Sequence, residues 1–180
     1  AAAFAASTAI YWQTAGFGFV QYDDVVITRS GQQVERGISA ESLQRIITPR
    51  GLATYQPLRD LAVEAVYEFN GLDPAGYHLF NLLCYLVVLA AVFGLLGRLL
   101  ALFRPEISGG RRLWAAVGTL LFAVHPVHVE AVAWVSSRKD VLSTFFWFLA
   151  LLAWGRYVKR PRPEWYAATL LCFVLGLMSK

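Results

Sequence analysis

The stretch Leu79–Gly97, LFNLLCYLVVLAAVFGLLG, decides the fold class. It has nineteen residues, no charged side chain and one strongly polar side chain, Asn81. At about 1.5 Å per residue, a helix of this length crosses roughly 30 Å of hydrocarbon. Of the 180 residues in the whole chain, 57% are hydrophobic and only 16% are charged, which is more apolar surface than a soluble domain of this size can bury. The composition predicts an all-α membrane protein and excludes a disordered chain.

Apolar stretches on both sides of this helix predict a polytopic protein. The expected segments are the end of a first transmembrane helix at 1–12, a long extracytoplasmic loop at 13–76, and transmembrane helices at 77–103, 113–135, 141–158 and 165–180. The first and last segments are too short to span, and the chain does not begin with Met, so we expect a fragment of a longer protein. Cys84 and Cys172 lie inside apolar stretches, which excludes a disulfide scaffold.

The basic residues predict the orientation, because Lys and Arg concentrate on the cytoplasmic side of a membrane. Arginines between positions 98 and 112, and basic residues between 156 and 162, place both of these connections in the cytoplasm. The loop 13–76, with eight acidic residues against five arginines, then shares the extracytoplasmic face with the turn Ser136–Asp140. The positions of the basic residues between apolar stretches thus account for the net charge of +4, and no nucleic-acid partner is expected.

Two amphipathic helices are expected within the long loop. Apolar residues recur at helical spacing from Leu58 to Phe69, with Pro57 near the first turn. A shorter helix is expected from Ser39 to Thr48, with Ser39 as its N-cap. Helices of this kind can lie on a membrane surface and frame a site at the lipid boundary.

Asp23 and Asp24 are the first candidates for chemistry, in the stretch GFGFVQYDDVVI just after the first apolar segment. A carboxylate placed at the membrane surface can act as a general base toward a lipid-borne substrate. A turn or a helix cap explains the same residues, because Asp is common in both and an Asp pair by itself is not specific.

A second group of polar residues lies in HPVHVEAVAWVSSRKD, residues 125–140, at a predicted membrane exit. Ionisable residues at membrane depth are costly and usually line a functional cavity. His125, His128 and Glu130 match no zinc-binding spacing, so we expect no metal site. We expect these residues either to donate or accept hydrogen bonds at a polar headgroup or to support the residues that contact it. His78 and Asn81, at the entrance of the clearest helix, are expected to make interfacial hydrogen bonds.

Arg138, Lys139 and Asp140 end this group. Arg and Lys suit a phosphate or pyrophosphate, whereas the alternative is that they snorkel and anchor a helix end. Asp140 would either orient Arg138 or cap a helix beginning at Val141.

Taken together, these motifs resemble the N-terminal membrane region of the TMTC-type proteins and their bacterial relatives, which are GT-C glycosyltransferases. The stretches that carry the resemblance are FVQYDD (19–24), YQPL (55–58), NGLDPAGYHLFNLL (70–83), FAVHPVHVEAVAWVSSRKDVLSTFFWFLALL (122–152) and LGLMSK (175–180). The resemblance covers nearly the whole chain, and residues 125–142 are its most specific part.

The resemblance implies a polytopic GT-C-like fold, often followed by tetratricopeptide repeats, and inverting transfer of a mannose-like sugar from a polyprenyl-phosphate donor to a protein or glycan hydroxyl. By position, it makes Asp23 or Asp24 the general base, places Arg138, Lys139 and Asp140 at the donor phosphate, and leaves the three histidines, Glu130 and Asn81 as support. The lipid-linked donor is a substrate, no cofactor is implied, and dependence on a divalent metal stays open. The implied partners are the bilayer, the donor and the acceptor, in a bacterial inner membrane.

Two other functions stay open at this stage. The region could be a non-catalytic membrane anchor or scaffold for a repeat domain. It could also be a transporter or flippase of lipid-linked sugars, because intramembrane His, Glu and Arg side chains can line a pathway.

Overall fold

The computed structural model describes residues 2–20, 24, 38–48 and 55–180. Within these ranges every regular element is a helix, as the sequence predicts. The elements are α1 (Ala2–Tyr11), η1 (Trp12–Gly16), α4 (Ala40–Ile47), α5 (Pro57–Asn70), α6 (Pro74–Phe103), η2 (Pro105–Gly110), α7 (Arg111–Ala123), α8 (His128–Ala133), η3 (Val135–Ser137), α9 (Arg138–Lys159) and α10 (Pro163–Leu177).

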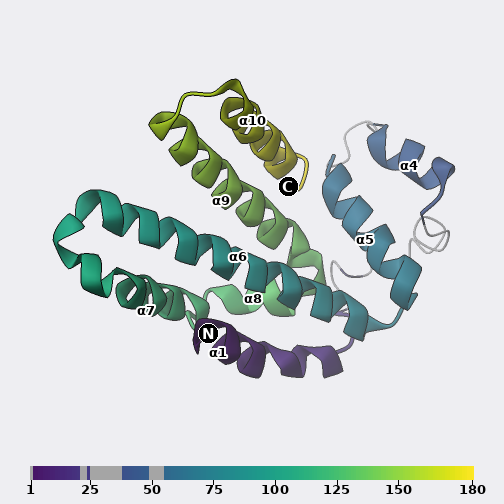
Figure 1. Cartoon of the computed structure of the whole chain (residues 1–180). Helices are drawn as coiled ribbons and strands as arrows, with labels where there is room; N and C mark the ends of the chain where they lie inside the picture. The colour runs from purple at the N-terminus through teal and green to yellow at the C-terminus, as the bar shows by residue number, and fades with distance from the viewer. Residues whose placement is uncertain (1, 21–23, 25–37, 49–54) are drawn as a thin grey trace.

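The long helix α6 is the centre of the arrangement. It contacts α7 on one side and α9 on the other, and α10 packs against α9 (Figure 1). Among the described residues, two helical stretches are long and apolar enough to cross a membrane, Pro74–Phe103 and Val135–Lys159. They contain the segments 77–103 and 141–158 that the sequence predicts as spans.

The predicted segment 113–135 is not one helix. α7 ends at Ala123, and the chain turns before α8 begins at His128. Pro126 explains the break, because its ring has no N–H to donate and clashes with the preceding turn of a helix. At about 1.5 Å per residue, the thirteen residues of α7 rise roughly 20 Å, less than the hydrocarbon thickness.

Both amphipathic helices of the long loop are confirmed. The hydroxyl of Ser39 accepts a hydrogen bond from the Ser42 amide at the start of α4, and Pro57 is the first residue of α5. Arg45 donates to Glu64 at 2.7 Å, which ties α4 to α5. Burial raises the pKa of the Glu64 carboxyl above its ordinary value, and the neighbouring Arg45 guanidinium only partly offsets this effect.

The core has two parts. The larger part lies where α6 meets α1, α7, α8 and α9, with Tyr85 and Leu89 of α6 almost fully buried. The smaller part joins Val63 and Val66 of α5 to Tyr77 of α6 and to Val135, just before α9. The smaller part fixes the amphipathic helix α5 against the beginnings of α6 and α9.

Candidate functional site

The carboxylate of Asp24 joins the first loop to the turn before α9. The side chain is fully buried, at 0% exposure. Oδ2 accepts a hydrogen bond from the Val20 amide at 2.9 Å, and Oδ1 accepts two from Ser136, at 3.0 Å from its amide and 2.6 Å from its hydroxyl. Two segments separated by 112 positions in the sequence therefore lie in direct contact. Asp23, the other predicted base, lies outside the described residues.

Arg138 is the first residue of α9, and its side chain lies inside the protein at 1% exposure. Nε donates to Asn81 Oδ1 at 3.0 Å, and Nη2 donates to the Tyr77 carbonyl at 3.3 Å. The guanidinium lies 5.3 Å from the ring centroid of Tyr77 and 4.9 Å from that of Phe80, distances at which a cation is attracted to an aromatic face. These contacts hold Arg138 against the first turns of α6.

Asn81 connects the two ends of the turn between α8 and α9. Its Nδ2 donates to the Trp134 carbonyl at 3.0 Å, while its Oδ1 accepts the bond from Arg138. The Ser137 amide closes the turn by donating to the Trp134 carbonyl at 3.2 Å. Because Asn81 is fully buried, water does not compete for these bonds.

His78 belongs to the same region. Its ring is 2% exposed, packs edge-on against Phe17, and lies close to the backbone of Gly18 and Ala133. The structure thus brings together four of the predicted site residues: Asp24, His78, Asn81 and Arg138.

The other histidines and Glu130 do not join this group. The His128 ring lies between Phe122 and Tyr85, with centroids 4.2 and 5.7 Å away. His125 is exposed and accepts a hydrogen bond from the Val127 amide through Nδ1, and Glu130 is exposed on α8. In the described ranges, no three His, Cys, Asp or Glu side chains are placed to hold a metal ion.

Lys139 and Asp140 lie in the first turn of α9, half-buried. Two of the predictions for Asp140, a cap for a helix beginning at Val141 and an orienting partner of Arg138, are wrong, and its place at the donor phosphate stays a prediction. The helix begins at Arg138 rather than Val141, and the carboxylate pairs with Lys180 at 2.6 Å instead of orienting Arg138. Arg138 finds its partners on α6, and Lys180 reaches Asp140 because α10 folds back along α9.

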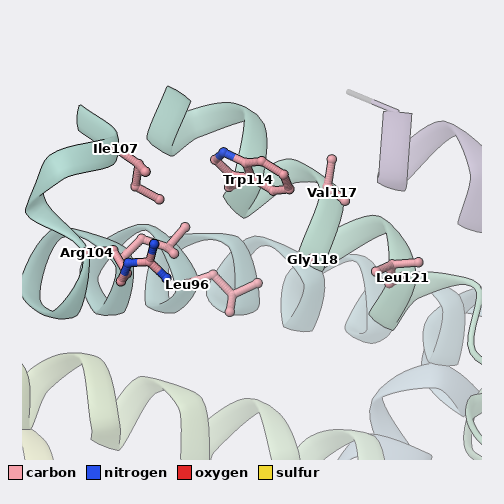
Figure 2. A pocket seen from close by; sticks show the side chains of 8 residues that line it. Leu96, Arg104, Ile107, Trp114, Val117, Gly118 and Leu121 are labelled. Carbon is pink, nitrogen blue, oxygen red and sulfur yellow. The ribbon is translucent and has the colours of Figure 1, made fainter. Parts of the chain in front are cut away.

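A separate cavity of about 530 Å³ lies between the end of α6, η2 and α7 (Figure 2). Leucine side chains, Trp114 and Arg104 line it. Leu96, its first lining residue on α6, follows Asn81 by fifteen positions, which is roughly 22 Å along a helix. The cavity is therefore not part of the site around Asp24.

Sequence reasoning missed Ser136 and Lys180. Ser136 occupies a turn before a helix, where a serine is unremarkable. Neither the spacing nor the residue type connects it with Asp24. Lys180 ends the motif LGLMSK, but its contact with Asp140 depends on the return of α10 along α9.

Comparison with known proteins identifies the family. Protein O-mannosyl-transferase tmtc2 of Xenopus laevis is 39% identical over 123 residues, 68% of this chain and 13% of that protein. TMTC3 of Homo sapiens is 30% identical over 183 residues, 96% of this chain and 18% of that protein. Tmtc2 of Drosophila melanogaster is 32% identical over 187 residues, 95% of this chain and 19% of that protein.

The chain thus spans between about one-eighth and one-fifth of the length of these relatives. No family model matches the chain, and no solved structure matches it. The identity to several members identifies this chain as a TMTC-type segment.

Proposed function

We propose that the protein is a multi-pass, GT-C-type glycosyltransferase of the extracytoplasmic membrane face, in a bacterial inner membrane. It transfers a mannose-like sugar from a polyprenyl-phosphate donor to a hydroxyl of a protein or glycan, with inversion. The names of the relatives, protein O-mannosyl-transferases, support the sugar and the protein acceptor. The two helices long enough to span support a bilayer setting.

The observation that carries the proposal is the contact between Asp24 and Ser136. It places Asp24 of the first loop beside the start of α9, where Arg138 and Lys139 lie. An inverting transfer needs a carboxylate near the attacking hydroxyl and positive charge near the departing phosphate. The contact brings both kinds of group to one end of the helix bundle.

The start of α9 suits an anionic leaving group for a second reason. The amides of a first helical turn and the helix dipole favour negative charge at this position. Lys139 adds an ammonium group there, and Arg138 adds a buried positive charge behind the turn. In this proposal, one carboxylate of the pair Asp23 and Asp24 accepts the proton of the acceptor hydroxyl.

A scaffold function is the second candidate, because Asp24 and Arg138 are both buried and bound to other parts of the protein. In a scaffold, these bonds would serve only to hold α6, α9 and the first loop together. The two candidates differ in whether the protein changes a lipid-linked sugar.

A transfer assay separates the two candidates. Membranes containing the full-length protein are supplied with radiolabelled polyprenyl-phosphate mannose, and the label that reaches protein is compared with that in membranes lacking the protein. The proposal expects protein-dependent labelling, with the anomeric configuration opposite to that of the donor. Absence of label with folded protein favours the scaffold.

A further inference from the structure

We propose that Ser136 is a positioning residue, which holds Asp24 of the first loop against the start of α9 by binding its carboxylate. The inference rests on the proposed transferase function.

Ser136 provides two donors to one carboxylate oxygen. Its amide and hydroxyl reach Asp24 Oδ1 at 3.0 and 2.6 Å, while the Val20 amide occupies Oδ2. Hydrogen bonds to an ionised group are stronger than those between neutral groups. Since Asp24 is fully buried, water does not replace a donor that is lost.

Ser136 is itself held in place. Asn81 binds the carbonyl of Trp134, and the Ser137 amide donates to the same carbonyl. Val135 is 1% exposed and packs in the smaller core cluster with Tyr77 and the α5 valines. The turn is fixed on both sides of Ser136, so Ser136 is a rigid support for Asp24.

The consequence is a fixed relation between Asp24 and the cationic start of α9. Ser136 lies two residues before Arg138, so the bond to Asp24 sets the separation of the two groups. Group transfer is sensitive to such placement, and a shift of about 1 Å can lower the rate by about a hundredfold. Loosening the bond should therefore reduce turnover more than it reduces donor binding.

The test compares Ser136→Ala, Ser136→Thr and the control Ser137→Ala in the full-length protein. Among the described residues, the Ser137 hydroxyl makes no hydrogen bond to Asp24. For Ser136→Ala we expect a kcat about tenfold lower per folded molecule, with the donor KM within about twofold of wild type. Ser136→Thr keeps the hydroxyl and should restore kcat to within about threefold, and Ser137→Ala should behave as wild type. Wild-type kcat in Ser136→Ala, or equal losses in Ser136→Ala and Ser137→Ala, overturns the proposal.

Hydrogen exchange provides a measurement that does not depend on transfer. Ser136→Ala should accelerate exchange of the amides at positions 20 and 136, both of which donate to Asp24, while Ser137→Ala should leave them unchanged. Unchanged exchange at both amides in Ser136→Ala overturns the anchoring. If the wild-type protein transfers no sugar, the proposed function fails, and the exchange result alone decides whether Ser136 anchors the loop.

Discussion

Replacing Asn81 with leucine tests the network around the turn before α9. The two side chains have similar size, but leucine can neither donate to the Trp134 carbonyl nor accept from Arg138. Loss of a buried hydrogen bond costs about 1–3 kcal/mol, and a bond to a charged group costs the upper part of that range. Asn81→Leu should therefore lower the free energy of unfolding by about 3–5 kcal/mol, which is the sum of the costs of losing the two hydrogen bonds.

The free cysteines supply the assay. Cys84 and Cys172 are both half-buried, so a thiol-reactive dye reports unfolding as the temperature rises. A loss of about 3–5 kcal/mol corresponds to a fall in Tm of roughly 6–20 °C for a chain of this size. The control is Asn70→Leu, the same substitution at an exposed position. A Tm for Asn81→Leu within about 2 °C of the control would refute the structural role of Asn81.

Three further predictions follow from individual residues. Gly71→Ala should lower the free energy of unfolding by about 1–3 kcal/mol, because Gly71 has φ +56° at the end of α5. The control is Gly109→Ala, at an open position without positive φ. Equal Tm values for the two variants contradict the prediction. Glu64→Gln should change the pH dependence of Tm. Because the folded pKa of Glu64 is raised above 4.5, this group contributes stability that is fully present below pH 4.5 and is lost as the pH rises through the folded pKa. Lowering the pH from about 7 to 4 should therefore raise the Tm of wild type relative to that of Glu64→Gln. A Tm difference between the two proteins that stays constant with pH would contradict this prediction. Lys139→Ala should lower kcat for transfer about tenfold, because the ammonium stabilises the charge that develops on the departing phosphate. Lys159→Ala, at the other end of α9, should leave kcat unchanged. An unchanged kcat for Lys139→Ala removes Lys139 from the donor site.

Local sequence signals predict the helices well. The apolar stretch Leu79–Gly97 lies within α6, and the cap Ser39 and the first-turn Pro57 mark the starts of α4 and α5. These features depend on residues within one or two turns of each other, which is the range over which helix capping and amphipathic spacing act. The turn at Pro126 is also a local signal, but the length of the apolar stretch 113–135 masks it.

The site is less predictable, because its contacts join distant parts of the chain. Asp24 and Ser136 are 112 positions apart, and Asn81 and Arg138 are 57 apart. The sequence predicts either a phosphate-binding or a snorkelling role for Arg138, and both roles place its charge near the protein surface. Only the packing of α6 against α9 explains how the side chain is buried. The return of α10, which brings Lys180 to Asp140, likewise depends on helix packing.

The most direct test of the account compares sugar transfer by wild type, by the double variant Asp23→Asn/Asp24→Asn, and by Glu164→Gln. Glu164 is an exposed acidic residue at the start of α10 and serves as a matched control. Radiolabelled polyprenyl-phosphate mannose is the donor, and label in protein is measured per folded molecule in membranes. The proposed mechanism predicts labelling by wild type and Glu164→Gln and none by the double variant. Equal labelling by all three proteins would contradict the claim that the acidic pair supplies the base.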